Sequence, residues 1–119
     1  MRDFLDMADF LDIMDLVLRD DAPTGIFNVS TGEGHTIKEV FDAVAGYLGI
    51  TLAEPVLVVP PGPDDVPAVV LDPTRTTEVL GWRAKIGFAE TIERMLRWYD
   101  AHGVSAIYSH LQAPAARQG

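Results

Sequence analysis

The chain of 119 residues fits one small domain with a modest hydrophobic core. It holds 18 Asp and Glu against 9 Lys and Arg, and the resulting net charge of −9 opposes binding to nucleic acid and to anionic membranes. Because it has no cysteine, disulfides, thiolate catalysis and cysteine-based zinc sites are excluded.

The N-terminal stretch MRDFLDMADFLDIMDLVL carries an aspartate at every third position. Residues 4–5 predict a short strand, and the helical spacing of the later apolar residues predicts a helix over 9–19 with Asp9 as its N-cap. The aspartate spacing does not match a calcium loop, which needs oxygen ligands at alternate positions and a central glycine. We therefore interpret the aspartates as a cap and a solvated helix face that carries Asp12 and Asp15.

A strand, a glycine-rich loop and a helix are predicted next. The apolar run IFNV at 26–29 indicates a buried strand, and the loop STGEGH follows it. Thr36 and Glu39 match a capping box, which predicts a helix that starts there and stops at Gly49. The loop could cradle a phosphate at the helix N-terminus or could be a plain connection. It lacks the GxGxxG and GxxxxGK[ST] patterns and carries Glu33, which favours the plain loop.

Two strands and two helices complete the predicted elements. PVLVVP at 55–60 and PAVVLD at 67–72 indicate short strands. Asp72 followed by proline predicts the N-cap of a short helix that ends at Gly81. Apolar residues at helical spacing predict an amphipathic helix over 88–103.

The side chains that could carry chemistry do not form a self-contained active site in the sequence. No serine stands in a GxSxG turn. His110 could act as a general acid or base, although a lone histidine near a terminus more often packs or hydrogen-bonds structurally. Trp82 and Trp98 are predicted to be core aromatics, and residues 112–119 are predicted to form a flexible tail. We therefore predict no catalytic residue and no metal site.

The element order is typical of an α/β chain with few strands. No apolar stretch approaches the roughly 20 residues that span a bilayer. Acidic residues stand where a secretory signal has basic ones. We expect a cytoplasmic protein with no nucleic-acid partner and no membrane partner.

Three sequence blocks resemble, in order and spacing, the C-terminal part of the extended short-chain dehydrogenase/reductase family. The blocks are RDFLDMADFLD, GIFNVSTGEGHTIKEVFDAV and DDVPAVVLDPTRTTEVLGWRAKIGFAETIERMLRWY, and together they cover most of residues 2–99. Members of this family are NAD(P)-dependent nucleotide-sugar epimerases and dehydratases. The resemblance implies the last strand of a Rossmann sheet plus a small α/β substrate-binding domain over residues 1–111, mostly helical with few short strands.

The cofactor half of such an enzyme is missing from the sequence. The family's glycine fingerprint is absent, and no lysine stands four positions after Tyr47, Tyr99 or Tyr108 to give the Tyr-x-x-x-Lys pair. The resemblance therefore implies that NAD(P) belongs to the parent enzyme, that the N-terminal Rossmann domain is absent here, and that this chain alone binds no cofactor and is inactive. The alternative is a non-enzymatic module that binds a sugar nucleotide or a protein partner.

Three substrate-binding residues follow from the resemblance. Arg2 matches an arginine that approaches the diphosphate of the nucleotide sugar, and its guanidinium suits phosphate oxygens; the alternative is a disordered terminal side chain. Asp65 matches the acid of an element in which an arginine stands just before a Gly-Asp pair, but Gly62 stands where the arginine would be, and a polar turn residue is the alternative. Thr36 lies near the family's substrate pocket, although its capping role already accounts for it.

A fragment of this kind should expose apolar surface. The predicted strand at 26–29 would lie inside the Rossmann sheet of an intact enzyme. We therefore expect exposed apolar edges and faces, and a homo-oligomer that forms through them.

Overall fold

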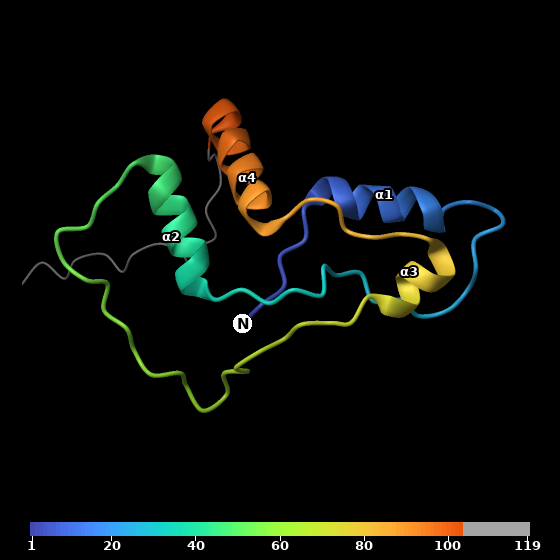
Figure 1. Cartoon of the computed structure of the whole chain (residues 1–119), viewed down its shortest axis with the longest axis horizontal. Helices are drawn as coiled ribbons and strands as arrows, with labels where there is room; N and C mark the ends of the chain where they lie inside the picture. Colours follow the sequence, from blue (N-terminus) through green and yellow to red (C-terminus); the bar gives the residue numbers. More distant parts are fainter. Residues whose placement is uncertain (104–119) are drawn as a thin grey trace, which may run out of the picture.

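The computed structural model describes residues 1–103, which form four helices joined by extended connections (Figure 1). Their bounds are α1 Met7–Val17, α2 Ile37–Leu48, α3 Thr74–Leu80 and α4 Phe88–His102. Figure 1 shows α1 near α3 at one end of the molecule and α2 near α4 at the other, and α2 and α4 are in contact. The predicted tail and His110 lie outside the described residues. Within residues 1–103, no helix is both long and apolar enough to cross a bilayer.

The expectation of a mostly helical chain is confirmed, but its predicted short strands do not form within residues 1–103. Backbone pairing is limited to bridges at Arg2, which lies antiparallel to His35 and parallel to Val69. The residues predicted as strands at 26–29 and 55–60 form no backbone bridge, and their side chains include Ile26, which is 86% exposed, and Val58, which is 87% exposed. A strand needs a partner for its N–H and C=O groups, so apolar composition alone does not create one.

The N-cap of helix α1 lies three residues earlier than predicted. Its N-cap is Asp6, whose Oδ1 accepts the Ala8 N–H at 2.8 Å. The prediction that Asp9 is the cap is therefore wrong. Asp9 lies inside the helix and is 2% exposed, because its carboxylate bonds to a distant segment of the chain. The predicted solvated face is confirmed, since Asp12 and Asp15 are exposed.

The core of the described part is small and draws on α1, the segment after α3, and α4. Its buried hydrophobic side chains are Ile13, Trp82 and Ile92. The Trp82 Nε1–H donates to the Asp9 carbonyl at 3.1 Å, so the indole is both buried and satisfied, as a core aromatic should be. The prediction that Trp98 is a core residue is wrong: it is 55% exposed on α4.

The local helix signals are largely correct. Thr36 and Glu39 form the predicted capping box, and α2 ends at Gly49, which adopts the left-handed conformation that favours glycine. Helix α3 ends in the same way at Gly81. The predicted cap of α3 is displaced by one residue, because Pro73 holds the N-cap position while the Asp72 carboxylate accepts the Thr74 N–H at 2.9 Å.

Glu39 makes the stability of the chain depend on pH. Its pKa lies below its ordinary value because the Thr36 N–H, and next the His35 ring, hydrogen-bond to the carboxylate. These bonds stabilise the fold above the ordinary pKa of 4.5 and are lost as the pH falls through the lower folded-state pKa. We expect the wild type to lose more free energy of unfolding than Glu39→Gln between about pH 6 and about pH 3.

Urea denaturation at the two pH values, followed by circular dichroism, measures this difference. Glu78→Gln is the matched control, because Glu78 is an exposed glutamate on α3 and should leave the pH dependence unchanged. Equal losses in the wild type and in Glu39→Gln would contradict the prediction.

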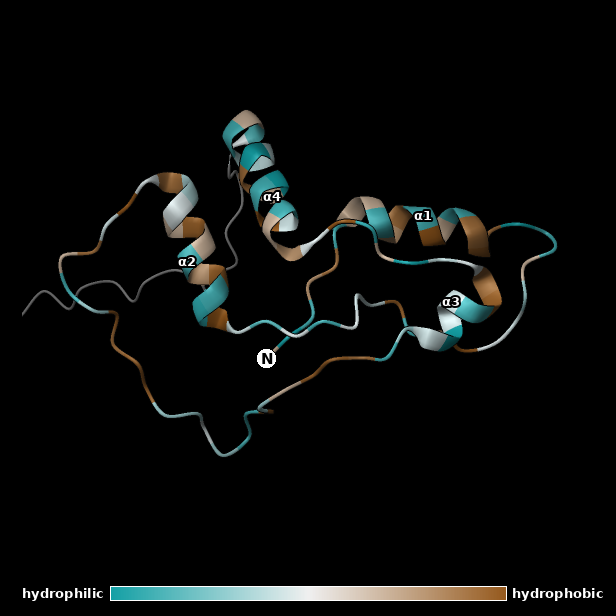
Figure 2. Cartoon of the chain, in the orientation of Figure 1, coloured by the Kyte–Doolittle hydropathy of each residue, from teal (hydrophilic) through white to brown (hydrophobic). Residues whose placement is uncertain are grey.

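Much apolar surface faces outward. Figure 2 shows hydrophobic stretches along the long connection between α2 and α3 and on α1. Leu57 is 85% exposed in that connection, and Leu18 is 75% exposed at the end of α1. The expectation of exposed apolar surface is confirmed; the homo-oligomer it suggested stays a prediction.

Candidate functional site

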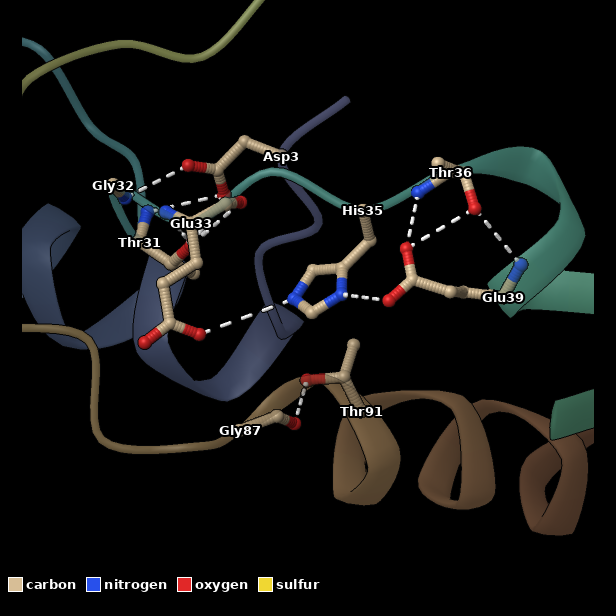
Figure 3. A network of polar contacts seen from close by, with 9 residues as sticks. All are labelled: Asp3, Thr31, Gly32, Glu33, His35, Thr36, Glu39, Gly87 and Thr91. Atoms are coloured by element: carbon tan, nitrogen blue, oxygen red, sulfur yellow. Dashed lines mark hydrogen bonds and ion pairs between the residues drawn. The ribbon is translucent and has the colours of Figure 1, made fainter. Parts of the chain in front are cut away.

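The glycine-rich loop is held by the carboxylate of Asp3 (Figure 3). One oxygen of Asp3 accepts the Thr31 N–H at 3.1 Å and the Thr31 hydroxyl at 2.7 Å, and the other accepts the Gly32 N–H at 2.8 Å. Gly32 has φ +80°, where a side chain would be strained. The N–H groups that a phosphate cradle would offer are thus occupied by the protein's own anion. The geometry favours the plain-loop interpretation.

Arg2 is fixed by its backbone. Its N–H donates to the His35 carbonyl at 2.9 Å, and its carbonyl accepts the His35 N–H at 2.8 Å. On its other side the Val69 N–H donates to the Met1 carbonyl at 3.0 Å, and the N-terminal ammonium donates to the Pro67 carbonyl at 2.6 Å. The chain at Arg2 is therefore ordered by two neighbouring segments, and its exposed guanidinium donates through Nη1 to the Met1 carbonyl at 2.8 Å.

His35 connects the loop to helices α2 and α4. Its ring stacks on Phe88 with centroids 4.0 Å apart and planes inclined by 10°. Nδ1 lies 3.4 Å from Glu39 Oε1, while Nε2 lies 3.9 Å from Glu33 Oε2 and has no hydrogen-bond partner among the described residues. The ring borders a cavity of about 200 Å³ lined also by Phe4. Sequence reasoning missed His35; the only local signal was its position before the cap and four residues from Glu39.

Thr36 is committed to the capping box. Its hydroxyl oxygen accepts the Glu39 N–H at 3.2 Å, while its own N–H donates to Glu39 Oε2 at 2.6 Å (Figure 3). Thr36 follows His35 directly. Because His35 forms a backbone bridge with Arg2, Thr36 lies one residue along the chain from that bridge. The structure therefore brings Arg2 and Thr36 to one junction.

Asp65 lies apart in a turn of the exposed connection between α2 and α3. Its Oδ2 accepts the Gly62 N–H at 2.6 Å, and its N–H donates to the Gly62 carbonyl at 3.2 Å. The side chain thus closes its own turn. The same connection reaches Arg2 four residues later, at Val69, which brings the turn within a short length of chain of the junction.

No group of three metal-ligating side chains gathers in the part of the chain that the structure describes. The junction instead offers one exposed guanidinium, ordered backbone and a histidine held between two glutamates. Such a set can bind an anionic ligand through Arg2.

Comparison with known proteins finds similarity to parts of enzymes that act on nucleotide sugars. Residues 1–95 match the family described as GDP-mannose 4,6 dehydratase. A UDP-glucose 4-epimerase of Caenorhabditis elegans is 36% identical over 63% of this chain and 21% of its own length. A probable UDP-arabinose 4-epimerase of Oryza sativa subsp. japonica is 32% identical over 86% of this chain and 25% of its own. The chain thus spans about a quarter or less of these curated relatives.

A solved structure shares the fold at higher identity. It is the Bordetella bronchiseptica enzyme WbmG in complex with NAD and UDP, with a TM-score of 0.84 and 64% sequence identity. The match covers 94% of this chain and 36% of WbmG.

Proposed function

The chain belongs to the extended short-chain dehydrogenase/reductase family, in the branch described as GDP-mannose 4,6 dehydratase, and we propose that it supplies the substrate-binding C-terminal part of an NAD-dependent nucleotide-sugar epimerase or dehydratase. Arg2 binds the diphosphate of the substrate. Thr36 and Asp65 border the same nucleotide. Oxidation of the sugar and return of the hydride belong to a dinucleotide-binding part that this sequence does not contain.

The observation that carries this proposal is the placement of Arg2. The backbone of Arg2 is held between two segments, which fixes where its side chain leaves the chain, and its guanidinium Nη1 donates to the Met1 carbonyl at 2.8 Å. Its fork of donors suits the oxygens of a diphosphate. WbmG, 64% identical over the matched region, was solved with UDP, and we therefore infer that the nucleotide is UDP.

The residues present do not fit the cofactor. NAD binding in this family uses a glycine fingerprint at a helix N-terminus, and the glycine loop of this chain has its N–H groups bonded to Asp3. The sequence also lacks the Tyr-x-x-x-Lys pair. The chain alone is therefore expected to bind substrate weakly and to catalyse nothing.

Titration of the isotope-labelled chain, followed by amide NMR shifts, tests the proposal. We expect UDP to shift the amides of Arg2 and Thr36 in a saturable way, while NAD at equal concentration leaves them nearly unchanged. The physical reason is that NAD is bound in this family through a glycine fingerprint that this sequence lacks, whereas the substrate diphosphate is expected to meet the Arg2 guanidinium. NAD binding tighter than UDP binding, or no UDP shift at Arg2, would overturn the assignment.

A further inference from the structure

We propose that His35 is a pH-dependent positioning residue of the Arg2 site. Protonation of its ring closes a clamp between Glu33 and Glu39 and raises the affinity of the site for the diphosphate of a nucleotide. The clamp consists of the side chains of His35, Glu33 and Glu39 (Figure 3). This inference rests on the proposed function, because it takes its ligand from it.

The His35 ring lies between two carboxylates. Its Nδ1 is 3.4 Å from Glu39 Oε1, and its Nε2 is 3.9 Å from Glu33 Oε2. A neutral imidazole has one N–H donor and one lone pair, whereas a carboxylate only accepts hydrogen bonds. One nitrogen of the neutral ring therefore directs a lone pair at a carboxylate. The protonated ring has an N–H donor for each carboxylate, so the arrangement of the clamp matches the charged form.

The Nε2 side of the clamp is open. Nε2 is buried and has no hydrogen-bond partner among the described residues, and a separation of 3.9 Å is too long for a hydrogen bond. The Glu33 side chain is 74% exposed and lines the same cavity of about 200 Å³ as the ring, so space is available for it to approach. A charge on the ring therefore draws Glu33 toward Nε2 and fixes the glycine-rich loop against His35.

Charged groups reach the ring from the other elements as well. Lys85, which precedes α4, lines the same cavity, and the positive N-terminal end of α4 begins at Phe88, on which the ring stacks. Both oppose protonation, whereas the clamp brings two full negative charges within 4 Å of the ring nitrogens. The remaining charged side chains of these elements are Asp3, bonded to the loop, Lys38, paired with Asp42 on α2, and Glu90 in the first turn of α4. The charge that faces the ring nitrogens is therefore mainly negative.

The backbone connects the ring to the Arg2 site. Arg2 and His35 are directly opposed, and each donates its N–H to the carbonyl of the other, at 2.9 Å and 2.8 Å. Directly opposed residues of an antiparallel pair project from the same face, with Cβ atoms about 4.5–5.5 Å apart. A charge on the ring thus lies on the same face as the guanidinium. A diphosphate bound at Arg2 therefore has one more positive charge nearby when the ring is protonated.

The UDP affinity of the chain at about pH 7.5 and about pH 5.5, measured by amide NMR titration, tests the clamp, because imidazole changes its charge in this range. The gain in affinity at the lower pH should be about threefold larger in the wild type than in His35→Gln. A unit charge about 6 Å from another in water has an effect of this size. The terminal phosphate of UDP also gains a proton in this range, but it does so for every variant, so the comparison removes its effect.

Two further variants separate the clamp from a general effect of histidine. In Glu33→Gln the extra gain should be lost, because the amide that it introduces can donate to the unprotonated Nε2. Glu33 is exposed, so this variant should keep the fold even if His35→Gln does not. His102→Gln is the matched control and should keep the gain, because His102 stacks on Trp98 at the other end of α4.

The ring signals of His35 provide a second measurement on the wild type. Binding and protonation are coupled reciprocally, so UDP should move the midpoint of the His35 ring titration to higher pH and leave that of His102 in place. Equal gains in the wild type and in Glu33→Gln, or a His35 midpoint that UDP does not move, would overturn this inference and leave the proposed function intact. Absence of a UDP shift at Arg2 at both pH values would overturn both.

Discussion

Replacement of Asp9 by alanine is expected to lower the free energy of unfolding by about 2–4 kcal/mol. The Asp9 carboxylate accepts the Lys85 N–H at 3.1 Å and the Ile86 N–H at 2.9 Å, and the residue is 2% exposed. Hydrogen bonds to a charged acceptor are roughly twice as strong as neutral ones. Removal of that acceptor also leaves two partly buried N–H groups without a partner. Urea denaturation followed by circular dichroism measures the loss.

Two further variants identify the cause. Asp12→Ala changes an exposed aspartate on the same helix and should alter stability by less than about 0.5 kcal/mol. Asp9→Asn keeps the shape and one acceptor oxygen, so its loss should fall between those of the other two variants. The Trp82 indole bonds to the Asp9 carbonyl and is retained in every variant. A loss in Asp9→Ala no larger than that in Asp12→Ala would contradict the assigned role.

Sequence reasoning identified the features of this fold that depend on neighbouring residues. The capping box at Thr36 and Glu39 and the glycine stops at Gly49 and Gly81 are decided within a few positions of the chain, and the structure has all of them. The role of Asp9 is decided by backbone that lies 76 and 77 residues later. Local periodicity carries no signal of that contact, so Asp9 was assigned to the helix end.

The predicted strands did not form for a related reason. Sequences such as PVLVVP have strand composition, but pairing requires a second backbone at the right distance. In residues 1–103 backbone bridges between segments form only at Arg2. Surface that would pair or pack inside a larger enzyme therefore remains exposed here, as at Ile26 and Leu57.

The residues of the candidate site likewise divide into those that the sequence could predict and those that it could not. Arg2, Thr36 and Asp65 came from the ordered family blocks, and their binding roles stay predictions. The structure adds that Arg2 and Thr36 share one junction, while Asp65 closes a separate turn. His35 could not be found from the sequence, because its stacking on Phe88 joins segments far apart in the chain.

Replacement of Arg2 by alanine should weaken UDP binding by about 10- to 100-fold, which corresponds to the loss of one charge-assisted hydrogen-bonded pair of about 1.5–3 kcal/mol. The side chain is exposed, its one hydrogen bond goes to the carbonyl of the adjacent Met1, and the backbone bonds of Arg2 to His35 do not involve it, so the fold should change little. Amide NMR titration with UDP gives the dissociation constants. Binding by the wild type should also weaken as salt is added, since an exposed guanidinium is screened.

Matched variants distinguish the guanidinium from bulk charge. Arg19→Ala removes one exposed arginine just beyond α1 and changes the net charge equally, so it should leave UDP affinity nearly unchanged. Arg2→Lys keeps the charge but loses the planar fork, and should recover only part of the affinity. If Arg2→Ala and Arg19→Ala weaken UDP binding equally, Arg2 acts only through net charge. Its exposed side chain would then be an ordinary terminal residue, and the diphosphate would need another cation, since Gly62 stands where the family's second arginine would be.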